Sequence, residues 1–120
     1  MLRTITVEYI RKCIAEAADR AEKAEYEAAW ARLCEAHILS QPDPKWHTIV
    51  HWHMLSLGCS QRSAREIVGQ VARLILAAPG SLSGRYPLGN TGRSDVSMFA
   101  PMPVSPEIKK LSEDLDSRRQ

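Results

Sequence analysis

The chain has 120 residues, which is the length of one ordinary domain. Hydrophobic residues make up 44% of it and charged residues 25%, and these globular values exclude a disordered or fibrous chain. Its 16 basic and 14 acidic residues are spread along the sequence and give a formal net charge of +2, so the charge pattern predicts no nucleic-acid partner.

Residues 1–41 contain neither glycine nor proline, and small or apolar residues recur there at spacings of three and four. This pattern is typical of an amphipathic helix. A single helix from Val7 to Leu39 would be about 50 Å long, which exceeds the diameter of a compact domain of this size. The densest charges lie midway, so we predict a turn near residues 22–25 between helices at about 6–22 and 26–39.

Two prolines at 42 and 44 end the second predicted helix, because each disfavours helical geometry in the residue before it. A third helix is predicted at 45–57, apolar around much of its circumference and therefore central. Gly58 suits a left-handed helix end, and either Ser60 or a capping box at Ser63 and Glu66 begins a fourth helix.

The fourth helix is predicted at 61–77, ending before Pro79. We expect its buried face to carry the apolar residues Ile67, Val68, Val71, Leu74, Ile75 and Ala78. Residues 79–106 hold four glycines and five prolines, which predict no regular element, yet they are too apolar for a solvated linker. The tail, 107–120, carries a thin apolar stripe.

These patterns predict a single all-α domain spanning residues 1–120. It is a four-helix array of antiparallel hairpins with a long, ordered Gly/Pro-rich C-terminal wrap over 79–106 and a short C-terminal helix. No run approaches the roughly 18 to 20 apolar residues of a membrane-spanning helix, and the first residues lack the apolar core of a secretory signal. We therefore expect no membrane insertion and a cytoplasmic protein.

Three of the four histidines lie where the second and third predicted helices meet. His37 falls in the last turn of one helix, His47 in the first turn of the next, and His51 one turn further along the same face. Because a short loop favours antiparallel neighbours, these side chains are expected to converge. His53 points to the opposite side of its helix.

Cys34, one turn before His37, would complete a set of four ligands suited to zinc or a similar divalent ion. Glu35 and Asp95 are additional candidate carboxylates. With three cysteines and no Cys-x-x-Cys pair, a disulfide framework is not expected. The alternative interpretation is that His47 and His51 form a hydrogen-bonded pair in the core.

Motifs of common enzymes are missing from the sequence. It has no His-Glu-x-x-His, no Gly-x-Ser-x-Gly, no P-loop and no dinucleotide fingerprint, so we expect no nucleotide cofactor. Three histidines would leave a coordination position open for an activated water, which keeps a metal-dependent enzyme as a third alternative. That alternative lacks an identifiable general base, so an enzyme is disfavoured.

The stretch Gly89-Asn-Thr-Gly92 exposes backbone amides between two cationic side chains, Arg85 and Arg93. Glycines that permit positive φ, amides and positive charge together are the ingredients of an anion site, with Asn90 at its centre. The alternative is that Asn90 and its neighbours only fasten the wrap through side-chain hydrogen bonds to the backbone.

Three stretches, Leu33-Cys-Glu-Ala-His37, His47-x-x-x-His51-Trp and Gly89-Asn-Thr-Gly92, resemble a small bacterial family of uncharacterised proteins, domain of unknown function 3703. The resemblance covers about residues 10–104 and implies that His37, His47 and His51 are the characteristic histidines of the family. Family members are often encoded beside heavy-metal efflux genes. They carry an acidic residue where this chain has Cys34.

The spacing of Ala29, Leu33 and Ala36 before Pro42 is also similar to the second helix of a tetratricopeptide unit, which implies helical hairpins of that style without a repeat array. The leading hypothesis is a small cytoplasmic protein that binds one divalent metal ion through the histidine cluster, in metal handling or sensing. The alternative is a non-enzymatic protein–protein interaction module or homodimer with structural histidines.

Overall fold

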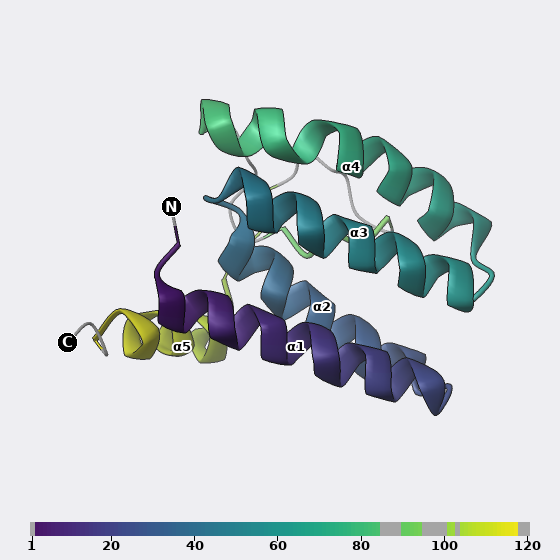
Figure 1. Cartoon of the computed structure of the whole chain (residues 1–120), viewed down its shortest axis with the longest axis horizontal. Helices are drawn as coiled ribbons and strands as arrows, with labels where there is room; N and C mark the ends of the chain where they lie inside the picture. Colours follow the sequence, from purple (N-terminus) through teal and green to yellow (C-terminus); the bar gives the residue numbers. More distant parts are fainter. Residues whose placement is uncertain (1, 85–89, 95–100, 103, 118–120) are drawn as a thin grey trace.

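The computed structural model describes residues 2–84, 90–94, 101–102 and 104–117. Over these residues all of its regular elements are helices, as predicted (Figure 1). Its elements are α1 (Thr4–Glu22), α2 (Tyr26–Ser40), α3 (Pro44–Ser60), α4 (Ala64–Ser83) and α5 (Pro106–Ser117). The chain reverses direction after each of the first three helices, so that α1 packs on α2, α2 on α3 and α3 on α4 (Figure 1).

The local sequence explains where these helices begin. Asp43 caps α3 by accepting a hydrogen bond from the Trp46 N–H at 3.1 Å, and Pro44 occupies the first helical position. Ser63 caps α4 by accepting from the Glu66 N–H at 3.3 Å. The turn between α1 and α2 falls at residues 23–25, within the region marked by dense charge.

Most of the apolar core lies between α1, α2 and α3. Its largest fully buried apolar side chains are Ile10, Trp30, Leu33, Val50 and Met54, so α3 is central as predicted. Leu115 of α5 joins this cluster, and its backbone carbonyl accepts a hydrogen bond from the side chain of Arg3, just before α1, at 3.0 Å. Within the described residues, none of the helices is both long enough and apolar enough to cross a bilayer.

Two predicted helix ends are wrong. α3 continues through Gly58 to Ser60, and the left-handed residue that follows it is Arg62, with φ of 56°. Gly58 instead lets the next helix approach closely, because a Cβ there would lie 3.0 Å from the Cβ of Glu66. The position does require a glycine, but the reason is close packing between helices and not a left-handed backbone conformation.

α4 does not stop before Pro79 but runs to Ser83, so the irregular wrap does not begin at residue 79. Pro79 is exposed, where its missing N–H is least costly. Buried Ser81 anchors the last turn by donating to the Gln41 carbonyl at 2.6 Å. The helix then ends at left-handed Gly84. Of the predicted wrap, residues 85–89, 95–100 and 103 lie outside the described residues.

The predicted buried face of α4 is also wrong. Val68, Val71 and Ile75 are exposed, and the buried side chains are mostly polar: Glu66, Gln70, Arg73, Ala77 and Ser81. A polar face can be buried only where its groups find partners. α4 therefore turns its polar side inward, toward the three histidines.

Candidate metal centre

The rings of His37, His47 and His51 meet between α2 and α3, as the sequence predicts. The Nε2 atom of His37 lies 3.0 Å from Nε2 of His51 and 3.1 Å from Nε2 of His47. The three residues are buried, with 3%, 6% and 3% of their surface exposed in chain order. Each offers one potential ligand atom to a common point, and these atoms lie within 4.8 Å of one another.

The Nδ1 atoms of His37 and His47 face acceptors. His37 Nδ1 lies 2.7 Å from the backbone carbonyl of Asn90, which can only accept, so this nitrogen carries the proton. His47 Nδ1 lies 2.8 Å from the Ser81 hydroxyl. Because that hydroxyl donates to the Gln41 carbonyl, it accepts from His47.

His51 is oriented in the same way by Gln70. The side-chain carbonyl of Gln70 accepts from His51 Nδ1 at 2.8 Å. Its amide nitrogen donates to the Gly92 carbonyl at 2.7 Å, which fixes the orientation of the amide group. All three imidazoles therefore hold their proton on Nδ1.

A neutral imidazole protonated on Nδ1 has a lone pair on Nε2. The cluster thus directs three lone pairs at one another at close range, with no hydrogen to place between them. Two nitrogens bound to one tetrahedral zinc ion at about 2.05 Å would lie about 3.3 Å apart. This is close to the two separations that His37 makes with His47 and His51. Acceptors on the far nitrogens are also the usual way in which metal-binding histidines are oriented.

Burial keeps these rings neutral. Burial, then the neighbouring His51 and His47, holds the pKa of His37 well below its usual value. Burial lowers the pKa of His47 to about 4 and that of His51 to about 3. At neutral pH no added proton occupies the space between the rings, and a cation that accepts all three lone pairs would relieve their repulsion.

Two predicted ligands do not join the cluster. Cys34 lies three residues before His37, about 60° around the helix axis, and packs against the hydrophobic core. The carboxylate of Glu35 accepts from the Tyr9 hydroxyl and forms an ion pair with Arg32 at 2.8 Å. In the described part of the chain the predicted set of four ligands is therefore reduced to three histidines.

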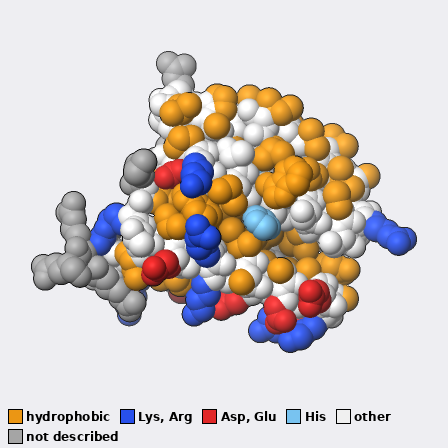
Figure 2. All heavy atoms as spheres, in the orientation of Figure 1, with side chains coloured by type: hydrophobic (Ala, Val, Ile, Leu, Met, Phe, Trp, Pro, Cys, Tyr) orange, Lys and Arg blue, Asp and Glu red, His pale blue; other side chains and the backbone are white. Residues whose placement is uncertain are grey.

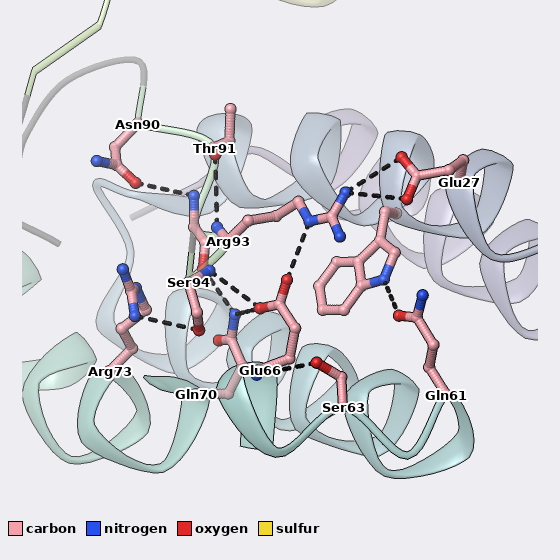
Figure 3. A network of polar contacts seen from close by, with 12 residues as sticks. Glu27, Gln61, Ser63, Glu66, Gln70, Arg73, Asn90, Thr91, Arg93 and Ser94 are labelled. Atoms are coloured by element: carbon pink, nitrogen blue, oxygen red, sulfur yellow. Dashed lines mark hydrogen bonds and ion pairs between the residues drawn. The ribbon is translucent and has the colours of Figure 1, made fainter. Parts of the chain in front are cut away.

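Arg93, a predicted anion-binding residue, is held by acidic side chains. Its Nε donates to Glu66 at 3.1 Å, a second nitrogen contacts Glu27 at 3.2 Å, and its guanidinium stacks on Trp30 (Figure 3). Glu66 also accepts from the Ser94 N–H at 3.0 Å. These contacts favour the alternative in which this stretch fastens the chain.

Asn90 belongs to the same fastening. Its side-chain oxygen accepts from the Gly92 N–H at 2.8 Å, and its backbone carbonyl orients His37. The other predicted residues of this region, Arg85 and Asp95, lie outside the described residues.

Sequence reasoning missed Gln70 and Ser81, which orient His51 and His47. Both are polar residues in a helix whose apolar residues suggested a different buried face. A glutamine placed four residues after Glu66, on one helical face, was the available signal.

A family model described as "Protein of unknown function (DUF3703)" matches residues 5–112. The chain therefore belongs to this family, as its three characteristic stretches indicated. No curated protein and no solved structure matches the chain.

Proposed function

We propose that this member of the family binds one divalent metal ion, zinc or a similar ion, through the Nε2 atoms of His37, His47 and His51, in metal handling or sensing. The observation that carries the proposal is the pattern of protons: three buried Nδ1–H groups donate to fixed acceptors, which leaves three converging lone pairs. A core pair of histidines needs no such arrangement. Three oriented imidazoles fit an ion in the way that known metal sites do.

The chemistry of the ligands favours late first-row metals. Imidazole nitrogen suits zinc, copper, nickel and iron, whereas magnesium and calcium prefer oxygen ligands. Three protein ligands leave the remaining coordination positions to water or to a group from a partner. This arrangement supports binding and exchange of an ion.

Titration of tag-free protein with Zn²⁺ and Co²⁺, by calorimetry and by the visible spectrum of Co²⁺, tests the proposal. We expect one ion per chain, and His47→Ala and His51→Ala should each abolish binding. His53→Ala is the matched control, because this histidine is on α3 but outside the cluster. A Kd weaker than about 1 µM for the wild type, or equal losses in the control, would refute the metal site.

A second candidate function is self-association through α4. Val68, Ile75 and Leu82 are 71%, 69% and 77% exposed, and Figure 2 shows hydrophobic side chains gathered along α4. Between residues 68 and 82 the only charged residue is buried Arg73, so the outer stripe carries no charge. Exposed apolar stripes of this kind mark contact surfaces, and a stripe on one helix can pack against the same stripe of a second copy across a two-fold axis.

Light scattering after size exclusion tests this second candidate. We expect the wild type to have the mass of a dimer and Ile75→Lys to have that of a monomer, because a buried lysine at the contact would be desolvated. Glu8→Lys, an exposed change on α1, should leave the dimer intact. A monomer at every concentration would exclude the contact.

A further inference from the structure

Residues 90–94, which we call the lid segment, are tied to two of the three histidines. The Asn90 carbonyl accepts from His37 directly. The Gly92 carbonyl accepts from Gln70, whose other end accepts from His51. The hydrogen bonds that orient His37 and His51 are therefore part of the same network that holds the lid segment in place.

The lid segment also lies directly against the cluster. Gly92 has φ of 84°, and a Cβ there would come within 2.7 Å of His37 Cδ2. Only a glycine backbone can approach an imidazole so closely in this conformation. The lid segment therefore covers the His37 ring.

One face of α4 anchors both the cluster and the lid segment. Gln70 lies one turn after Glu66, and its amide contacts the Glu66 carboxylate at 3.4 Å. Glu66 holds the lid segment through the Ser94 N–H and the side chain of Arg93, and Figure 3 shows these side chains side by side. A change in the hydrogen bond between His51 and Gln70 can therefore affect the lid segment directly, through the Gly92 carbonyl, or through one further residue, Glu66.

We propose that closure of the lid segment is coupled to metal occupancy, so that the bound ion fastens residues 90–94 and its loss releases them. The proposal rests on the function proposed above. An ion on Nε2 withdraws charge from the ring and makes Nδ1–H a stronger donor to Asn90 and Gln70. Without the ion, the facing lone pairs repel one another and loosen the rings that hold these bonds.

Coupling between two events is reciprocal. If the ion favours closure by some factor, closure raises the affinity for the ion by the same factor. This makes the lid segment a readout of the metal, the property that a sensor needs, and it gives two independent experiments.

Limited trypsin digestion of the full chain is the first experiment. Arg93 is a cleavage site inside the lid segment, whereas Lys23 is an exposed site in the turn between α1 and α2. We expect saturating Zn²⁺ to slow cleavage after Arg93 about tenfold or more and to leave cleavage after Lys23 unchanged. Equal slowing at both sites would indicate general stabilisation and overturn the coupling.

The second experiment weakens the lid segment without altering a histidine. Glu66→Gln should raise the Kd for Zn²⁺ about fivefold or more, because the carboxylate that accepts from Arg93 and Ser94 loses its charge. Glu25→Gln, which breaks an exposed ion pair with Arg20, is the matched control and should leave the Kd unchanged.

The outcomes separate the two proposals. Stoichiometric binding of Zn²⁺ with unchanged cleavage after Arg93 would overturn the coupling and leave the metal site standing. If no Zn²⁺ binds, the metal site itself fails and the coupling fails with it. Because the digestion uses the unmodified protein, the result does not depend on how well Glu66→Gln folds.

Discussion

Gln70 shows how much of the site depends on one side chain. It is fully buried, accepts from His51 and donates to the Gly92 carbonyl. The carboxamide provides both an acceptor and a donor here, whereas a carboxylate cannot donate and an apolar side chain can do neither. The residue is therefore a positioning residue for His51 and a fastener of the lid segment at the same time.

Replacing this amide should weaken the binding of the metal ion more than it lowers the stability of the fold. We expect Gln70→Leu to raise the Kd for Zn²⁺ about 10- to 100-fold, the usual cost of losing a group that orients a metal-binding histidine. Calorimetry measures it, with circular dichroism to verify folding. Gln61→Leu is the control, because Gln61 accepts from Trp30 away from the cluster. Equal affinity in a folded Gln70→Leu protein would contradict the orienting role.

At the scale of whole helices, the positions of the helices could be predicted from the sequence better than the faces that they bury. Periodicity and charge located the helices and the first turn. The short loop expected between α2 and α3 was enough to bring His37 close to His47. These are local features, set by residues near one another in the chain. The convergence of the three rings followed from them.

The buried face of α4 is not local. Its apolar residues are numerous enough to suggest a core, but its inward side is chosen by hydrogen bonds across 19 to 34 residues of sequence, from Gln70 to His51 and from Ser81 to His47. The contact of His37 with Asn90 spans 53 residues. The periodicity of a sequence contains no information about such long-range pairs. The convergence of the histidines was therefore predictable, whereas the residues that orient them were not.

The whole molecule combines an apolar core with a polar seam. α1, α2, α3 and α5 share the core, whereas α4 joins α3 in part through paired polar groups around the histidines. Buried polar groups stabilise a fold only while every partner is in the right protonation state. The stability of the metal-free protein should therefore depend on keeping the rings neutral.

This dependence has a defined sign and pH window. In the unfolded chain the histidines take up protons below 6.5, while in the folded protein the pKa of His47 falls to about 4 and that of His51 to about 3. The unfolded state then binds more protons, so stability is complete above pH 6.5 and is lost as the pH falls toward 4. Each histidine that stays neutral in the folded protein but is protonated in the unfolded chain lowers the free energy of unfolding by about 1.4 kcal/mol for each pH unit in this window.

Urea denaturation in the presence of a chelator, at pH 7 and at pH 5.5, measures the loss. Glu66 and Asp43 also have a lowered pKa, because hydrogen-bond donors outweigh their burial: backbone N–H groups at both, and side chains at Glu66 alone. The unfolded carboxylates, however, take up protons only near 4.5 and 3.8. The interval from pH 7 to 5.5 therefore reports mainly the histidines. His51→Ala should reduce the loss by more than His53→Ala does, since His51 is the more deeply buried. Equal stability of the wild type at the two pH values would show that the three rings are not held neutral by the fold.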